Sequence, residues 1–342
     1  MGLKRRKVFP VGPTAPFVMH SIPLQVSQVE PIEGMIGPSA ALRRLREKIT
    51  RVAAAPRTTV LVTGESGVGK EVVARGIHAR SERCDGPFIA LNCAALTDGL
   101  LEAELFGHEP GAYTGASSKG RDGLFAAANG GTLLLDEIGE LAPELQAKLL
   151  RVLQERCYRR VGGNKDQTTD VRIIACTNRD LSQLVEQGRF REDLYYRLNV
   201  LVLRVSPLRE RRDDITPIAL HLCDEIEREH GIRTGGLSEA SLATLEGHSW
   251  PGNVRELKNA IERAAVECAG ATIEPGHLGI TLAATAAAID SEDDSELNLK
   301  RMEERLIRRA LDATGGNRSR SARLLGVNRA TLYNKLRAYQ IA

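Results

Sequence analysis

The sequence predicts an α/β fold, in which helices cover a parallel sheet, followed by an all-helical segment and a small all-α domain at the C-terminus. Short β-branched apolar runs alternate with helical patterns between residues 58 and 205. This alternation is typical of parallel strands joined by crossover helices. Residues 213–268 show helical patterns only, and a basic helical tail begins at residue 298.

Five apolar runs are expected to form the strands of one sheet: residues 58–63, 87–92, 130–137, 171–178 and 200–205. A helical spacing of apolar residues at 40–52 precedes the first strand. Further helices are expected at residues 71–78, 96–106 and 143–155. The last of these begins with Pro143, a residue that helices favour at their first position. Residues 157–169 are polar, contain glycine and are expected to form a loop.

The composition changes along the chain indicate several segments. Residues 1–33 hold five prolines without any periodic pattern, and a stretch before residue 297 is first alanine-rich and then acidic. Helices are expected at 215–230, 238–247 and 253–268, with Ser238 as an N-cap. The expected segments are therefore a flexible arm (1–33), an α/β domain (34–206), a helical lid (207–280), a linker (281–297) and a C-terminal helical domain (298–342).

The loop between the first strand and its helix reads Gly64-Glu65-Ser66-Gly67-Val68-Gly69-Lys70. A strand, the pattern G-x-x-x-x-G-K and a helix together form the context of a phosphate-binding loop. Its glycines let backbone N–H groups face an anion, and the helix N-terminus adds its positive end. Lys70 supplies a mobile charge for the outer phosphates, so a nucleotide is expected here. Glu71 follows, where the usual pattern has a Ser or Thr that binds Mg²⁺.

Polar residues follow the carboxyl ends of three strands: Asn92, Asp136, Glu137, Thr177 and Asn178. Open α/β sheets bind ligands at these ends, so the five side chains are expected to converge on Lys70. Asp136 is expected to hold Mg²⁺, directly or through water. Glu137 is expected to polarise the attacking water as a general base. The alternative is a pair of surface carboxylates that cap a helix.

The net charge of +3 conceals an uneven distribution. From Asn298 to the end there are 11 Lys or Arg against 3 Asp or Glu, a net charge of +8, whereas the preceding residues hold 36 against 41, a net charge of −5. A basic tail on an acidic body indicates nucleic-acid binding at the C-terminus.

No apolar run is long enough to span a bilayer, and no signal-peptide core follows the basic N-terminus. The six cysteines are scattered, without a C-x-x-C pair, which favours reduced thiols over a disulfide framework or a zinc site. A cytoplasmic protein without a membrane partner is therefore expected.

The tail shows a helical stripe at residues 302–311, then two short helices at 319–325 and 329–339 separated by Gly326-Val327. Two short helices across a glycine-containing turn are typical of a helix-turn-helix. Leu325, Val327, Leu332 and Leu336 are expected to pack inward. The residues left facing out can hold phosphates and read base edges: Asn328, Arg329, Thr331, Asn334 and Lys335. The alternative is a charged helical hairpin used for contacts between subunits.

These motifs, in this order, resemble those of the AAA+ ATPases, and specifically the bacterial sigma-54-dependent transcription activators, or enhancer-binding proteins. The resemblance covers about residues 36–280 and the tail. Its most discriminating motif is Gly111-Ala112-Tyr113-Thr114-Gly115-Ala116. In the family a surface loop reading GAFTGA touches sigma-54 and couples hydrolysis to remodelling of the polymerase. Here the phenylalanine is replaced by Tyr113, which keeps the ring and adds a hydroxyl.

The resemblance implies roles for further residues. Glu71 resembles the family's own phosphate loop, which often ends GKE. Asn92 resembles the residue that contacts Glu137 and senses the γ-phosphate, and Thr177-Asn178 resembles sensor I. Within the FREDLYYRL segment at 190–198, Arg191 and Arg197 resemble arginine fingers that reach the neighbouring subunit's nucleotide. Arg255, at the start of the sensor II helix, resembles the lid residue aimed at the phosphates.

The resemblance implies an enhancer-bound activator that hydrolyses ATP with Mg²⁺ in a ring, from dimer to hexamer, and remodels sigma-54 RNA polymerase closed complexes into open complexes. The tail resembles a Fis-type DNA-binding domain. The arm is too short for a sensory domain, so a separate regulatory protein is one expectation. Two alternatives stay open: a DNA-bound regulator whose ATPase only switches its oligomeric state, and an AAA+ motor acting on DNA during repair or replication.

Overall fold

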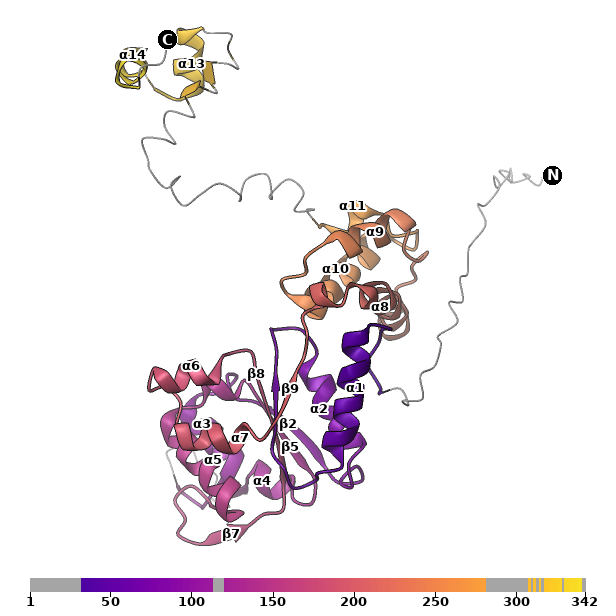
Figure 1. The fold of residues 1–342 in the computed structure, drawn as a ribbon, viewed down its shortest axis with the longest axis vertical. Coiled ribbons are helices and arrows are strands. Elements are labelled where there is room, and N and C mark those ends of the chain that lie inside the picture. The colour runs from indigo at the N-terminus through magenta and orange to yellow at the C-terminus, as the bar shows by residue number, and fades with distance from the viewer. Residues whose placement is uncertain are drawn as a thin grey trace, which may run out of the picture. The chain divides into compact units, whose positions relative to one another are not determined.

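The structure, a computed structural model, describes residues 32–112, 120–280, 307–308, 310–311, 314, 317–327 and 329–339. The chain divides into two compact units, Met1–Ile280 and Thr281–Ala342. Figure 1 shows the α/β and helical parts of the first unit, and the helices of the second.

The first unit contains a five-stranded parallel sheet with the strand order β2-β5-β8-β1-β9, which confirms the predicted fold class and its five strands. The strands are β1 Val60–Thr63, β2 Phe88–Asn92, β5 Thr132–Asp136, β8 Arg172–Thr177 and β9 Leu201–Arg204. Asn92 pairs in register with Asp136, and Thr63 with Thr177. The carboxyl ends of these four strands therefore meet at one edge of the sheet.

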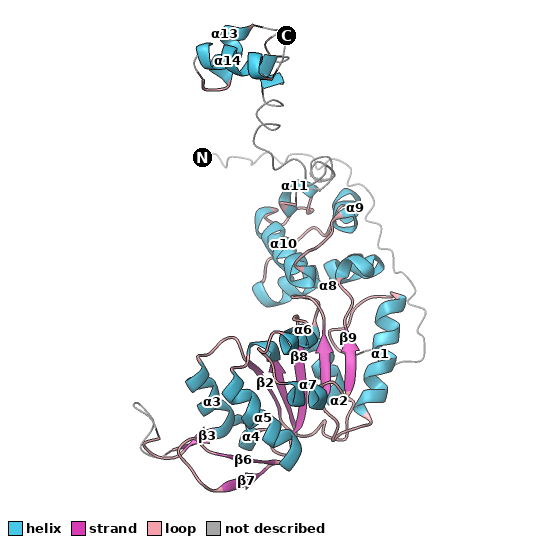
Figure 2. Cartoon of the chain, turned by 60° about the vertical axis from the view of Figure 1, so that its left-hand side comes forward, coloured by secondary structure: helices cyan, strands magenta, loops and turns pink. Residues whose placement is uncertain are grey.

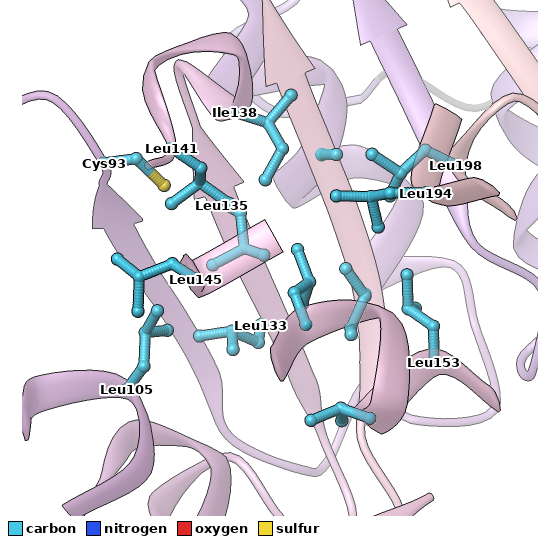
Figure 3. Close-up of a cluster of buried hydrophobic side chains, with 14 of the residues drawn as sticks. Cys93, Leu105, Leu133, Leu135, Ile138, Leu141, Leu145, Leu153, Leu194 and Leu198 are labelled. Carbon is cyan, nitrogen blue, oxygen red and sulfur yellow. The ribbon is translucent and has the colours of Figure 1, made fainter. Parts of the chain in front are cut away.

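Helices cover both faces of the sheet (Figure 1). On one face, α1 (Ala40–Ala53) and α2 (Lys70–Ala79) pack Ile49, Val73 and Ile77 against apolar strand residues. On the other face lie α3 (Asp98–Phe106), α4 (Leu124–Ala127), α5 (Pro143–Glu155), α6 (Leu181–Glu186) and α7 (Glu192–Leu198). Figure 3 shows part of this second core, in which Leu133 and Leu135 face Leu145 and Leu194.

The four helices predicted before residue 156 are confirmed, and α5 begins at Pro143 as expected. Helices α4, α6 and α7 were not predicted. Each is shorter than two full turns, so an apolar period cannot be recognised reliably in its sequence.

The prediction of a loop at residues 157–169 is wrong, because β6 (Cys157–Arg159) and β7 (Asp166–Thr168) pair as an antiparallel hairpin. The cross-strand pair of Arg159 and Asp166, 2.6 Å apart, and the buried ring of Tyr158 stabilise it. Strands of three residues show too little alternation to be predicted. Figures 1 and 2 place this hairpin, and β3 (Gly107–His108) with β4 (Arg121–Asp122) near it, at the end of the sheet away from the lid.

The lid contains the three predicted helices, α8 (Ile215–His230), α9 (Glu239–Gly247) and α10 (Asn253–Glu267), together with the unpredicted α11 (Pro275–Leu278). Their apolar faces enclose the fully buried Trp250, whose Nε1 donates to the Leu245 carbonyl. Ser238 caps α9 as expected, since its Oγ accepts from the Ser241 N–H. The described part of the first unit also contains three single-turn 3₁₀ helices, η1 (Ile138–Glu140), η2 (Leu208–Glu210) and η3 (Arg212–Asp214).

In the second unit, α13 (Arg318–Leu324) and α14 (Arg329–Ala338) flank a turn at Gly326, which has a φ of +67°. Leu325, Val327, Leu332 and Leu336 pack together with Ile307 and Ala322, which confirms the predicted inward face. None of the helices in the described ranges is both long and apolar enough to cross a membrane.

A buried histidine links α2 to the sheet. His78 Nδ1 lies 2.9 Å from Thr132 Oγ1, and its ring packs 5.3 Å from the ring of Phe88. Burial lowers the pKa of His78, and the nearby guanidinium of Arg172 lowers it further. The folded state therefore favours the neutral imidazole.

Replacement of His78 by Asn should flatten the pH dependence of stability. Unfolding restores the pKa of His78 to about 6.5, so the contribution of the neutral imidazole to the free energy of unfolding is fully present above that pH. As the pH decreases below about 6.5, the free energy of unfolding falls by at most about 1.4 kcal/mol per pH unit, because the unfolded state takes up one more proton. Urea unfolding at pH 7 and pH 5 measures this loss. An equally large loss in H78N would contradict the assignment.

Candidate functional site

The phosphate loop joins the end of β1 to the start of α2. Gly64, Gly67 and Gly69 have φ angles of +156°, +76° and +98°, a region that side chains with a Cβ rarely adopt. Gly69 is the N-cap of α2, and Lys70 is its first residue. The loop therefore has the backbone that wraps an anion at a helix N-terminus.

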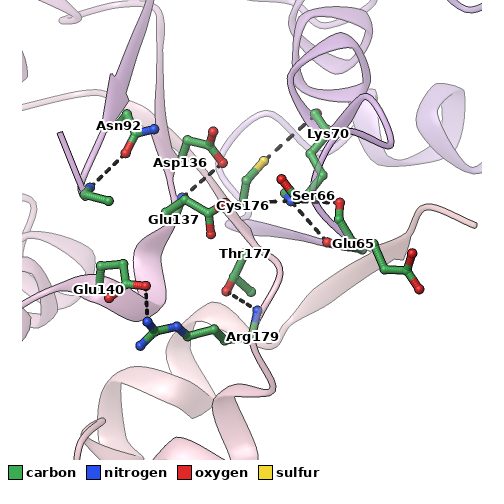
Figure 4. A network of polar contacts seen from close by, with 12 residues as sticks. Glu65, Ser66, Lys70, Asn92, Asp136, Glu137, Glu140, Cys176, Thr177 and Arg179 are labelled. Carbon is green, nitrogen blue, oxygen red and sulfur yellow. Dashed lines mark hydrogen bonds and ion pairs between the residues drawn. The ribbon is translucent and has the colours of Figure 1, made fainter. Parts of the chain in front are cut away.

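Lys70 lies inside this loop, with only 8% of its surface exposed. Its Nζ donates to the carbonyls of Gly64 and Glu65 at 3.1 and 3.2 Å. The same Nζ is 4.0 Å from Glu137 Oε1, which comes from the end of β5. Figure 4 shows this side chain between the two strand ends. The ammonium group is thus positioned between the loop and the general-base candidate.

Asp136 and Glu137 form the second side of the site. Asp136 Oδ1 accepts a hydrogen bond of 3.0 Å from the Glu137 N–H. Glu137 has a φ of +52° and a ψ of +48°, a left-handed conformation that costs a residue with a Cβ roughly 1–2 kcal/mol. This sharp bend begins η1 immediately after the strand. Strained residues of this kind are concentrated at functional sites.

The other strand-end residues lie beside this pair. Asn92 Oδ1 accepts from the Ala94 N–H, next to Asp136 in the sheet (Figure 4). Thr177 is fully buried, and its Oγ1 accepts from the Arg179 N–H. Thr177 and Asn178 line a cavity of about 420 Å³ together with Gly64. The sheet thus brings Glu137, Thr177 and Asn178 to the phosphate loop, whereas Asn92 lies beside Asp136 on β2, three strands away from β1.

The lid contacts the phosphate loop through the start of α10. Arg255 Nη1 donates to Ser66 Oγ at 2.9 Å. Asn253 Nδ2 donates to the Ser66 carbonyl and to Glu65, and its Oδ1 accepts from the buried Leu208 N–H at 2.7 Å. A Cβ on Gly67 would lie 2.3 Å from the Gly252 carbonyl, so only glycine permits this close approach.

Glu65 extends this connection to η2. Its carboxylate accepts two hydrogen bonds, of 2.8 and 2.6 Å, from Arg209. The hydrogen bonds from Arg209 and then from Asn253 lower the pKa of Glu65 to about 2. Arg209 and Asn253 were not predicted as site residues. The available signal for Asn253 was its place directly after Pro251-Gly252, at the start of the predicted helix.

Comparison with known proteins identifies the family. Residues 35–204 match the sigma-54 interaction domain, residues 209–295 the AAA+ ATPase lid domain, and residues 298–339 the Fis family of bacterial regulatory proteins. The transcriptional regulatory protein ZraR of Klebsiella oxytoca is 48% identical over 304 residues, which cover 89% of this chain and 68% of ZraR. This chain belongs to the sigma-54-dependent transcriptional activators.

Further relatives and solved structures are similar to this chain over most of its length. The regulatory protein AtoC of Escherichia coli K12 is 48% identical over 301 residues, covering 86% of this chain and 65% of AtoC. A crystal structure of NtrX from Brucella abortus superposes with a TM-score of 0.69 at 37% identity, covering 90% of this chain and 69% of NtrX. NtrX in complex with ATP superposes with a TM-score of 0.66 at 34% identity. The activator is thus an ATPase with a DNA-binding helix-turn-helix domain.

Neither of the two arginines expected to be fingers lines the cavity beside the activator's own phosphate loop, although Tyr195 and Asn199 of the same segment do. Arg191 is exposed at the N-cap of α7, and its guanidinium donates to Asp193 at 3.0 and 2.7 Å. Arg197 is exposed on α7 and donates to the Leu153 carbonyl at 3.2 Å.

The loop motif expected to touch sigma-54 is described only at its start. Gly111 has a φ of +71°, and the Ala112 N–H donates to the Glu109 carbonyl. Tyr113, Thr114, Gly115 and Ala116 lie outside the described residues. At the base of the loop, Arg160 of the β6–β7 hairpin pairs with Glu109 on one side and Asp122 on the other.

In the helix-turn-helix, Arg329 and Asn334 are exposed on α14, and Thr331 and Lys335 are half-buried. Asn328 lies outside the described residues. The guanidiniums of Arg318 and Arg329 lie over the ring of Tyr333, which is 42% exposed, at 5.2 and 5.9 Å from its centroid.

Replacement of Asn253 by Ala should lower the free energy of unfolding by about 2–4 kcal/mol. The change removes the acceptor of the buried Leu208 N–H and leaves a Cβ residue at a φ of +53°. Asn253→Gly loses the same hydrogen bonds without that strain, so its loss should be smaller. Denaturant unfolding of both variants measures the difference. An equal loss in both would contradict the role of strain.

Proposed function

We propose that this activator binds ATP with Mg²⁺ at residues 64–70, hydrolyses it in a ring of subunits, and uses the loop at 111–116 to convert sigma-54 polymerase closed complexes into open complexes. The observation that carries this proposal is the position of Lys70 Nζ, within its own loop and 4.0 Å from Glu137. The ATP complex of the related NtrX supports ATP as the nucleotide.

The roles follow from this geometry. Backbone N–H groups of the loop and the N-terminus of α2 receive the phosphates, and Lys70 exchanges its bonds to loop carbonyls for bonds to the outer phosphates. Glu137 orients and deprotonates the attacking water. Asn92 and Thr177 sense whether the γ-phosphate is present, and Arg255 reports the nucleotide to the lid.

The residues present fit a magnesium ion. Mg²⁺ usually takes one or two carboxylates together with waters and substrate phosphates. Asp136 offers such a carboxylate beside the loop, since Glu137 N–H uses only its Oδ1. Glu71 is directed elsewhere, because it accepts two hydrogen bonds from Arg75 on the surface of α2. When bound, the ion would neutralise charge on the β- and γ-phosphates.

A ring explains the position of the arginines. Arg191 and Arg197 are exposed on α7, and neither lines the cavity beside their own phosphate loop. A head-to-tail contact between subunits would bring them to the next subunit's ATP, and such heterologous contacts close into rings. Permanently charged planar guanidiniums suit the charge of phosphoryl transfer.

A continuous set of contacts connects the site to the loop. Thr177 ends β8, and β8 follows directly after the β6–β7 hairpin. The hairpin holds the loop base through Arg160, and Val161 exchanges backbone hydrogen bonds of 2.9 and 3.0 Å with Gly107 and Glu109. Movement at the sensor end of β8 therefore reaches the segment that carries the loop.

Lys70→Ala should abolish ATP binding, whereas Glu137→Gln should bind ATP and lose turnover. The first change removes the charge that holds the phosphates, and the second removes only the base. Fluorescent-nucleotide binding and phosphate release measure the two effects, and turnover of E137Q should fall by at least about 10²-fold. Equal nucleotide affinity in K70A and wild type would overturn the assignment of the loop.

Mixing Arg191→Ala with Lys70→Ala should restore part of the hydrolysis that each variant lacks alone. K70A subunits keep their fingers, and R191A subunits keep their phosphate loops, so a mixed ring contains complete sites. Fingers supply about 10³–10⁵ in rate, so even partial recovery is measurable. A mixture no more active than its components would exclude fingers acting in trans.

Removal of residues 298–342 should eliminate specific DNA binding and keep ATP hydrolysis, because the first unit has its own hydrophobic cores. DNA selected from a random pool by the full chain provides the probe, and gel retardation provides the measurement. The truncated chain's ATPase rate is the control for folding. Retention of specific binding would contradict the assignment of the tail.

A further inference from the structure

A buried glutamine connects the catalytic turn to the finger segment. Gln146, on α5, has no exposed surface. Its Nε2 donates to the Leu141 carbonyl at 2.8 Å and to the Arg189 carbonyl at 3.0 Å, and its Oε1 accepts from the Arg191 N–H at 2.8 Å. Both amide hydrogens and the amide oxygen are thus used, all with backbone groups.

The two segments that Gln146 joins are distant in sequence and different in function. Leu141 follows η1, which begins immediately after Glu137. Arg189 and Arg191 lie at the start of the finger segment, 43 and 45 residues beyond Gln146. In Figure 3, Ile138 and Leu141 lie on one side of the same apolar core and Leu194 and Leu198 on the other.

The backbone at Arg191 depends on this glutamine. Arg191 is the N-cap of α7, and its own side chain makes no capping hydrogen bond. Phe190 is anchored by its buried ring and by its N–H, which donates to the Leu184 carbonyl. The Arg191 N–H instead donates to Gln146, while its exposed guanidinium is paired only locally with Asp193.

We propose that Gln146 is a positioning residue for Arg191: it fixes where the finger is presented to the next subunit, relative to the turn that carries Glu137. This inference rests on the proposed action of Arg191 in trans. Replacement of Gln146 is expected to lower ATP hydrolysis in the next subunit's site, because Arg191 acts there. A displacement of about 1 Å at a reacting centre can cost about 10²-fold in rate.

The mixed-ring assay distinguishes an effect of Gln146 on the finger of a subunit from an effect on the phosphate loop of the same subunit. Gln146→Met keeps the length of the side chain and removes its three hydrogen bonds. The change is placed either in the K70A subunit, which only supplies fingers, or in the R191A subunit, which only supplies the phosphate loop. We expect K70A/Q146M mixed with R191A to lose about tenfold or more of the restored rate. K70A mixed with R191A/Q146M should stay within about twofold.

Gln154→Met provides the matched control, because Gln154 is exposed on the same helix. Q154M should change the restored rate of ATP hydrolysis in neither mixture. Sedimentation of each mixture and thermal unfolding of each variant establish that rings form and subunits are folded. Equal losses in both arms, no loss in either, or a loss that accompanies failure to assemble would each overturn the positioning role. If K70A and R191A restore no hydrolysis without Q146M, the finger assignment itself fails.

Discussion

The parallel register of β1, β5 and β8 is the constraint on which the rest of the structure depends. It places the carboxyl ends of these strands at one edge of the sheet. The phosphate loop, Asp136-Glu137 and Thr177 therefore meet there because of the strand pairing itself. The buried apolar side chains of these strands fix this register, since helices cover both faces. The positions of the site residues at the edge of the sheet are therefore determined by the packing of apolar side chains in its middle.

The conformation of the phosphate loop also depends on its contacts with the lid. Glu65, Ser66 and Gly67 are held by Arg209, Asn253 and Gly252, and the strained φ of Asn253 is maintained by the buried hydrogen bond that it makes. A nucleotide that draws Lys70 toward its phosphates must act on a loop already attached to the lid. We therefore expect nucleotide state and lid position to be coupled through these contacts.

The sequence predicted the sheet, most long helices and the phosphate loop, because long buried runs and glycine spacing carry strong local signals. It did not predict the β6–β7 hairpin, whose strands have three residues each. It also missed Arg209, Asn253 and Gln146, because their importance arises from tertiary contacts across 45 to 188 residues. The arginines of α7 were predicted as fingers from their family motif alone, and their exposure became visible only in the structure.

Open-complex formation tests the central claim most directly, that hydrolysis at the phosphate loop is converted into remodelling of sigma-54 polymerase. The purified chain is incubated with sigma-54 holoenzyme and a sigma-54 promoter, and permanganate footprinting detects melted DNA. Melting that requires hydrolysable ATP, and that is absent with a non-hydrolysable analogue, is the predicted result. Vigorous ATP hydrolysis without any melting would contradict the account and favour an ATPase that only switches the oligomeric state of a DNA-bound regulator.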